Sequence, residues 1–72
     1  MNTFKIRYYT KKELALLYFP DSQPRTAVRH LNAWIYKCKQ LHADLLEMGY
    51  QARNKGFTPR EVKAIVEQLG EP

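Results

Sequence analysis

The sequence lacks the features that many small domains rely on for stability. The 72-residue chain has one cysteine, Cys38, which cannot form an intramolecular disulfide, and no Cys/His spacing typical of a zinc site. No stretch approaches the length of a transmembrane helix, and the first twelve residues lack the apolar run of a signal peptide. These absences predict a cytoplasmic protein that is stabilised by packing, without a metal, a cofactor or a membrane as partner.

Catalytic constellations are also missing from the sequence. His30 and His42 lie twelve positions apart, with no carboxylate spaced to form a metal pair or an acid–base couple with them. No glycine-rich phosphate loop is present. Cys38 falls within an apolar pattern, so we expect a buried structural thiol rather than a nucleophile. We therefore expect neither enzymatic activity nor a small-molecule substrate.

Acidic residues are scarce relative to basic ones. Twelve Lys and Arg against seven Asp and Glu give a formal net charge of +5. The excess is concentrated in residues 1–12, which contain no acid, and in residues 53–63, where Glu61 is the only acid. Basic domains of this size often bind phosphate backbones, but net charge also serves solubility. Charge alone leaves both interpretations open.

The hydrophobic pattern predicts one mainly α-helical domain over residues 1–72, with a small β-hairpin. Residues 4–10, FKIRYYT, alternate apolar and basic side chains in the manner of a strand. The apolar side of this strand would be formed by Phe4, Ile6 and Tyr8. Thr10 and Glu13 then form a capping-box pattern, which predicts a helix over residues 11–18.

The middle of the chain carries an apolar stripe at helical spacing. Pro20 ends the first helix, Asp21 or Ser22 is expected to cap the next one, and Pro24 suits its first turn. The stripe consists of Ala27, Leu31, Trp34, Cys38, Leu41, Leu45 and Met48. One continuous helix would satisfy the stripe, but its 25 residues would be long for so small a chain. Two helices with a break around residues 38–40 are favoured.

A basic hairpin is predicted next. Gly49 is placed to end the preceding helix. Residues 50–52 and 56–58 can then pair as short strands around Arg53-Asn54-Lys55-Gly56, where Asn and Gly tolerate positive φ. The aromatic rings that frame this turn, those of Tyr50 and Phe57, are expected to pack into the core rather than to stack on bases.

The last helix has strong local signals at both ends. Thr58-Pro59-Arg60-Glu61 is a second capping box, with proline at the first helical position. The predicted helix covers residues 59–69 and ends at Gly70. Its apolar residues, at i, i+3, i+4 and i+7, are Val62, Ile65, Val66 and Leu69.

The order of these elements favours DNA binding. Two helices joined by FPDSQP, residues 19–24, form a candidate helix-turn-helix, whose second helix would read base edges in the major groove. Arginine can grip guanine and asparagine can pair with adenine, so the outward face of helix 25–38 has suitable chemistry. The candidate DNA contacts on this helix are Arg25, Thr26, Arg29 and Asn32. An ordinary solvated helix surface would carry similar residues.

The predicted hairpin adds a second contact surface. Residues 53–56 would form a basic wing whose glycine lets the backbone approach a phosphate closely. Arg53 and Lys55 are therefore candidate phosphate contacts, which give affinity rather than sequence choice. Arg60, in the first turn of the last helix, completes the set of candidate DNA-binding residues.

The sequence also resembles two groups of proteins. YTKKELA, a tryptophan-containing helix, GY, FTPREV and the closing LGEP together resemble an uncharacterised family of short Bacteroides proteins, over about residues 4–72. More remotely, residues 9–15 and 57–62 resemble parts of MerR-like and excisionase-like winged helix-turn-helix domains. This resemblance implies that residues 25–33 read DNA and that residues 53–55 lie on its backbone. Residues 37–48 depart from the pattern of MerR-like and excisionase-like domains. The segment between the expected recognition helix and the hairpin is longer and more helical here than in those domains, and it contains two acids.

Two functional hypotheses follow from the sequence. The favoured one is a winged helix-turn-helix-like domain that binds double-stranded DNA, as a small transcriptional regulator or an excisionase-like accessory factor. The alternative is a protein-interaction module or homodimerising adaptor that uses the apolar stripe over residues 27–48, without nucleic acid. DNA binding predicts steep salt dependence and damage from charge reversal at Arg29 or Lys55, whereas an adaptor would self-associate and tolerate those changes.

Overall fold

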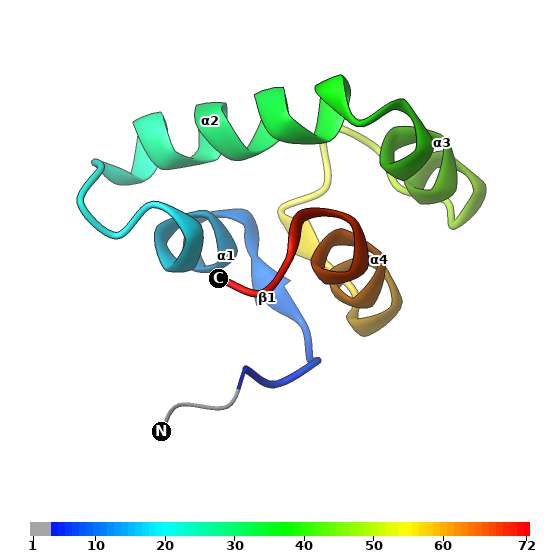
Figure 1. The fold of residues 1–72 in the computed structure, drawn as a ribbon, viewed down its shortest axis with the longest axis horizontal. Coiled ribbons are helices and arrows are strands. Elements are labelled where there is room, and N and C mark those ends of the chain that lie inside the picture. The colour runs from blue at the N-terminus through cyan, green and yellow to red at the C-terminus, as the bar shows by residue number, and fades with distance from the viewer. Residues whose placement is uncertain (1–3) are drawn as a thin grey trace.

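The structure, a computed structural model, describes residues 4–72 as four helices and one two-stranded antiparallel sheet (Figure 1). In chain order the elements are β1 (Tyr9–Thr10), α1 (Lys11–Tyr18), α2 (Pro24–Lys37), α3 (Lys39–Glu47), β2 (Gly56–Phe57) and α4 (Pro59–Leu69). In Figure 1, α2 runs along the upper edge of the molecule, with α1 beneath its N-terminal half and α3 at its C-terminal end. None of the helices in the described part of the chain is long and apolar enough to cross a membrane.

The first and last helices begin at reciprocal capping boxes, as predicted. Thr10 Oγ1 accepts the Glu13 N–H at 3.1 Å, and Glu13 Oε1 accepts the Thr10 N–H at 2.9 Å. Thr58 and Glu61 repeat this exchange, with Pro59 in the first turn of α4. Each box satisfies two N–H groups that a helix start leaves without a partner. The predicted bounds, residues 11–18 and 59–69, are confirmed.

The middle of the chain forms two helices, which confirms the favoured alternative. Cys38 separates them, with an extended backbone at φ −87° and ψ 90°. Gly49 follows α3 with a φ of +88°, a conformation that glycine adopts without steric cost. The predicted cap of α2 is wrong, because Asp21 and Ser22 lie in the preceding turn and Gln23 occupies the N-cap position without a side-chain hydrogen bond.

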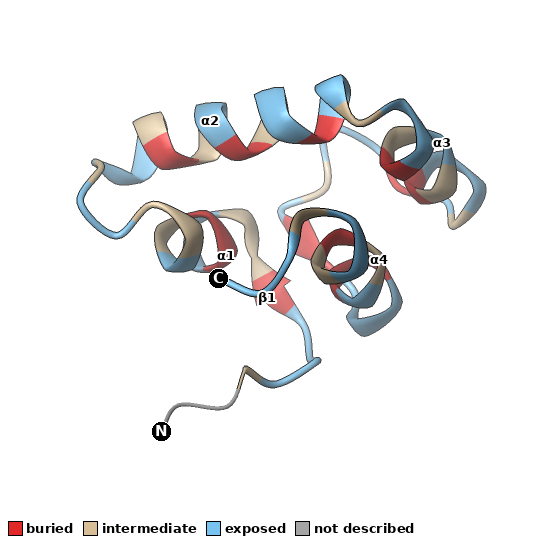
Figure 2. Ribbon diagram, viewed as in Figure 1, coloured by how far each residue is buried: buried red, intermediate tan, exposed pale blue. Residues whose placement is uncertain are grey.

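The hydrophobic core lies between the four helices (Figure 2). Its largest fully buried side chains are Phe57, Leu14, Leu31, Leu41, Leu45, Ile65 and Val62. The predicted stripe is wrong at one position, because Ile35 is 3% exposed whereas Trp34 is 41% exposed. The inward row of α2 therefore follows i, i+4 spacing through Ala27, Leu31 and Ile35, which leaves Trp34 at the side of the helix.

The predicted N-terminal strand is mostly absent among residues 4–10. Only Tyr9 and Thr10 pair with β2, and it is Tyr9 that is buried, while Ile6 and Tyr8 are exposed. The Tyr9 ring stacks on Phe4 with centroids 5.3 Å apart, and its hydroxyl donates to the Lys5 carbonyl at 2.8 Å. Next to the sheet, the buried residue is thus Tyr9 instead of the predicted Tyr8, a difference of one position.

The predicted hairpin is also wrong in its pairing. β2 pairs with β1, Tyr9 opposite Phe57 and Thr10 opposite Gly56, whereas residues 50–52 form no strand. Residues 51–54 instead form a turn, in which the Asn54 N–H donates to the Gln51 carbonyl at 2.9 Å. Tyr50 and Phe57 are buried with their rings stacked at 5.4 Å, as expected for core residues. The part of the chain that the structure describes is therefore mainly helical, without the predicted wing.

Candidate nucleic-acid interface

Three of the four candidate DNA contacts predicted on α2 lie in its N-terminal half, and Asn32 lies just beyond its middle. Arg25 and Arg29 are exposed, whereas Thr26 and Asn32 are half-buried. Figure 2 shows that the outer side of α2 is exposed along much of its length. Because residues three and four apart lie on one side of a helix, Arg25, Arg29 and Asn32 share a common face.

Two adjoining hollows border this face of α2. The first, of about 440 Å³, is lined by Lys12, Pro24, Arg25 and Val28. The second, of about 380 Å³, is lined by Thr10, Lys11, Lys12, Val28 and Lys55. Lys12 and Val28 line both hollows, which therefore lie side by side between the starts of α1 and α2 and the 51–55 turn. We call the two hollows together the basic groove.

The position of Lys55 depends on contacts from α1. The Lys11 N–H donates to the Lys55 carbonyl at 3.0 Å, which extends the pairing of β1 with β2. The Lys11 ammonium donates to the Ala52 carbonyl at 2.5 Å and lies 5.2 Å from the centre of the Tyr50 ring. Lys11 thus holds the 51–55 turn against α1, which brings Lys55 next to Lys12.

The charges of the basic groove are available to a ligand. No side-chain hydrogen bond in residues 4–72 engages the head groups of Lys12, Arg25 or Lys55, and no acidic residue lines either hollow in that part of the chain. Glu13 lies beside the groove, where its carboxylate accepts the Thr10 N–H. This backbone hydrogen bond, aided by the Thr10 hydroxyl and the charge of Arg7, lowers the pKa of Glu13. Its carboxylate therefore stays ionised as part of the cap of α1.

Arg53 and Arg60 do not line the basic groove. The Arg53 Nε donates to Gln51 Oε1 at 2.7 Å, within the turn itself. Arg60 is exposed in the first turn of α4. The structure therefore brings Arg25 and Lys55 together with Lys12, a residue that the sequence did not single out, and leaves Arg53 and Arg60 outside the groove. In the sequence, Lys12 is only one of several basic residues near the N-terminus. Its place beside α2 could not be predicted, because the contact of α1 with α2 joins residues far apart in the sequence.

Comparison with known families decides where the chain belongs. The sequence model of a domain of unknown function, DUF4248, matches residues 5–72. The chain belongs to the DUF4248 family. No curated protein and no solved structure gives a significant match to it.

The other flank of α2 in the DUF4248 domain is aromatic. The Phe19 ring lies 4.7 Å from Trp34 and 5.3 Å from His30, and Tyr18 lies 6.2 Å from Trp34, all as edge-to-face pairs. We call these four residues the aromatic flank. Their contacts join the end of α1 to the middle of α2. In Figure 1, α1 points toward the viewer, whereas α2 lies across the view. The two helices are joined by the short segment of residues 19–23.

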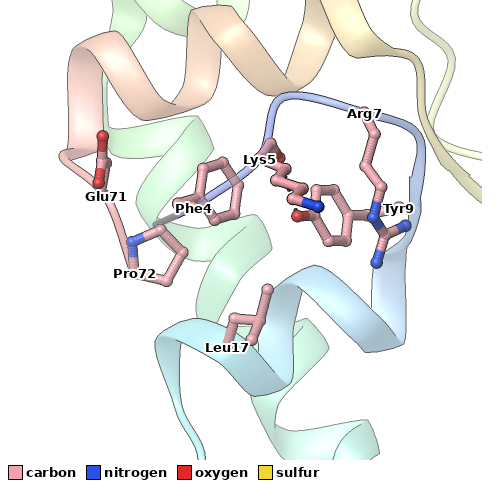
Figure 3. A pocket seen from close by; sticks show the side chains of 7 residues that line it. All are labelled: Phe4, Lys5, Arg7, Tyr9, Leu17, Glu71 and Pro72. Atoms are coloured by element: carbon pink, nitrogen blue, oxygen red, sulfur yellow. Dashed lines mark hydrogen bonds between the residues drawn. The ribbon is translucent and has the colours of Figure 1, made fainter. Parts of the chain in front are cut away.

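Another hollow of the DUF4248 domain, of about 450 Å³, lies between its N-terminal segment and its last residues (Figure 3). Its lining residues are Phe4, Lys5, Arg7, Tyr9, Leu17, Glu71 and Pro72. The hollow differs from the basic groove because it contains charges of both signs. Nearby, the Tyr18 hydroxyl donates to the Gly70 carbonyl at 2.5 Å, and burial, with a contribution from the Glu71 carboxylate, raises the pKa of Tyr18 to about 12.

Within residues 4–72, no group of three or more His, Cys, Asp and Glu side chains is arranged to hold a metal ion. Cys38 is half-buried between α2 and α3, near Gln68 of α4. The arrangement that stands out chemically is the basic groove beside the exposed face of α2.

Proposed function

We propose that this DUF4248 domain binds double-stranded DNA. The N-terminal half of α2, with the side of the basic groove that it forms, would lie in the major groove, and Lys12 and Lys55 on the opposite side of the groove would lie against the sugar–phosphate backbone. The observation that carries the proposal is the convergence of Lys12, Arg25 and Lys55 from three separate segments, in hollows without an acidic lining residue. Neutralisation of phosphates by such clusters supplies most of the affinity of DNA-binding proteins. The crossing of α1 and α2, and the resemblance of YTKKELA to MerR-like and excisionase-like domains, add support.

In this binding mode the side chains of α2 and of its neighbours have different roles. Arg25 and Arg29 extend from the exposed face of α2 toward base edges, where arginine can donate bidentately to guanine. Lys12 and Lys55 contact phosphates, which fixes the register of the helix but does not select a sequence. The residues at the edges of this surface, Thr26 and Asn32, are half-buried and have less reach.

The acids of α3 do not oppose this binding mode. Asp44 and Glu47 belong to α3, which lies at the C-terminal end of α2, whereas the basic groove borders its N-terminal half (Figure 1). Asp44 also accepts a hydrogen bond from Gln40 Nε2 at 2.9 Å within α3. A duplex that contacts Arg25 and Lys55 is therefore displaced along α2 from these carboxylates.

The experiment that tests the proposal is fluorescence anisotropy with a labelled mixed-sequence duplex at several salt concentrations. Three to four phosphate contacts predict a slope of roughly −3 in a plot of log binding constant against log salt concentration. The double variant Lys12→Glu/Lys55→Glu is expected to lower the affinity at least ~10-fold and to flatten the slope by about 2, since each lost phosphate contact removes about 0.9 from it.

The matched control is a double charge reversal outside the groove. Lys39→Glu/Lys63→Glu changes the net charge by the same amount, at exposed positions at the start of α3 and on α4. The proposal predicts a distinctly smaller loss of affinity for this control. Equal losses of DNA affinity for the two double variants would mean that the net charge of the protein, and not the basic groove, determines its affinity for DNA. Absence of duplex binding by the unmodified protein at low salt would refute the proposal.

A protein-interaction function has one observation in its favour. Large apolar side chains are exposed on the helices, and the fractions are 41% for Trp34, 57% for Tyr36 and 55% for Leu46. The apolar stripe itself is not available, because Ala27, Leu31, Leu41 and Leu45 are buried in the core. An adaptor would therefore use the exposed residues instead. Sedimentation analysis over a range of concentrations tests this second candidate, which predicts self-association that Tyr36→Ala/Leu46→Ala abolishes.

Regulator and accessory roles are separable once a DNA site is known. An excisionase-like accessory factor acts by shaping the duplex, whereas a simple regulator needs only to occupy its site. Gel-shift analysis with circularly permuted DNA fragments measures the bend that the protein introduces. We expect an accessory factor to bend its site and a regulator of the simple kind to leave it nearly straight.

A further inference from the structure

Val28 occupies an unusual place in the basic groove. It is the apolar side chain that lines both hollows, and its neighbours there include Lys12, Arg25 and Lys55. The fully inward row of α2 is formed by Ala27, Leu31 and Ile35, whereas Val28 is half-buried and packs against the core from outside that row. Part of this side chain therefore faces the ligand side of the groove rather than the interior.

The position of Val28 along α2 suits contact with a base. It lies three residues after Arg25 and four before Asn32, on the face that the proposed binding mode turns toward the major groove. The N-terminal residues of a recognition helix are those that reach base edges. A valine in a helix has one strongly preferred χ1 rotamer, so its two methyl groups are held in fixed positions.

The major groove presents one apolar group to such a side chain. Guanine, adenine and cytosine offer hydrogen-bond donors and acceptors at their edges, whereas thymine adds a C5-methyl group. A valine methyl group cannot form hydrogen bonds with the polar edge of a base. It can, however, pack against the C5-methyl group of thymine. The flanking arginines would bind guanines at neighbouring positions.

We propose that Val28 is a specificity-determining residue, which selects a thymine in the bound duplex by packing against its C5-methyl group. This inference rests on the proposed DNA binding and names the sequence feature that the same surface prefers. Removal of one buried methyl group is expected to weaken binding about fourfold, from ~0.8 kcal/mol for each buried carbon.

The test begins with selection of preferred sites from a random duplex pool by the full chain. Each thymine of the selected site is then replaced singly by deoxyuridine, which keeps the base pair and removes only the methyl group. We expect one position at which this replacement weakens binding about fourfold for the unmodified protein. The Val28→Ala variant is expected to bind the thymine site about fourfold more weakly and to be insensitive to deoxyuridine at that position.

A matched variant separates lost contact from lost stability. Val66→Ala makes the same truncation at a half-buried position of α4, away from the basic groove, and is expected to keep the sensitivity to deoxyuridine. The inference is overturned if no single replacement weakens binding of the selected site, or if Val28→Ala keeps the sensitivity of the unmodified protein. Binding of duplexes without any sequence preference also overturns it, but leaves the proposed function standing. Absence of duplex binding overturns both.

Discussion

On one flank of α2, Val28 lies among Lys12, Arg25 and Lys55, whereas on the other flank Trp34 and His30 pack against the aromatic rings at the end of α1. The aromatic flank consists of mutual contacts at ring separations of 4.7–6.2 Å. The basic groove instead leaves three cations without a side-chain partner in the described part of the chain. Contacts on one flank thus hold α1 against α2, and the charged side chains of the other flank are not used for that packing.

The largest effect is expected where the basic groove depends on close backbone packing. A Cβ at Gly56 would lie 2.5 Å from the Tyr9 carbonyl oxygen and would also clash with the Tyr8 hydroxyl, so the two strands cannot keep their separation. Gly56→Ala is expected to lower the free energy of unfolding by about 3 kcal/mol, the upper part of the range for overpacking. Urea denaturation measures this loss. An unchanged stability would contradict the pairing of β1 with β2.

Removal of an aromatic ring should affect stability but not DNA affinity. Phe19 is half-buried and contacts both Trp34 and His30, so Phe19→Ala is expected to cost about 2 kcal/mol, less than a fully buried phenylalanine. The affinity for duplex DNA, measured well below the melting temperature, should stay within about twofold. A loss of affinity comparable to that of Lys12→Glu/Lys55→Glu would mean that the two flanks do not act separately.

A smaller effect is expected from the lysine that holds the 51–55 turn. Lys11→Met keeps most of the aliphatic side chain but removes the hydrogen bond to the Ala52 carbonyl, which should cost ~1 kcal/mol. Because the turn carries Lys55, the DNA affinity should also fall, about two- to threefold. Thermal unfolding and anisotropy together measure the two effects. Lost affinity without lost stability would instead indicate that Lys11 contacts DNA directly.

The smallest effect concerns the pH dependence of the aromatic flank. The pKa of Tyr18 is raised to about 12, so the folded state favours the neutral hydroxyl that donates to the Gly70 carbonyl. This contribution is complete below pH ~10, the ordinary pKa of tyrosine, and is lost as pH rises toward 12. Tyr18→Phe should therefore be slightly less stable than the unmodified protein at pH 7. The difference should shrink between pH 10 and 12, and a constant difference would exclude this origin.

The elements that the sequence predicted correctly are those defined by local spacing. Both capping boxes join residues three apart, and the glycines after α3 and α4 mark the ends of those helices. The break at Cys38 was predicted from the length of the stripe, a weaker argument that the structure nevertheless confirms. Each of these features can be predicted without knowing which distant segments of the chain are in contact in the folded protein.

The features that the sequence could not predict depend on distant contacts. Gly56 and Phe57 pair with residues 9 and 10 rather than with residues 50–52, and no local pattern distinguishes these partners. Trp34 and Ile35 both fit a helical period, and the choice between them depends on the rings of Tyr18 and Phe19 at the end of α1. For the same reason Lys12 became part of the candidate site only when the packing of α1 on α2 was known.

Nuclear magnetic resonance mapping of a duplex titration on ¹⁵N-labelled protein tests the proposed DNA interface residue by residue. If DNA lies in the basic groove, we expect the signals of the backbone amides of Lys12, Arg25, Val28 and Lys55 to shift progressively with added DNA, while the indole N–H signal of Trp34 stays in place. Shifts confined to Trp34 and its neighbours, with the basic groove unaffected, would contradict the proposed interface.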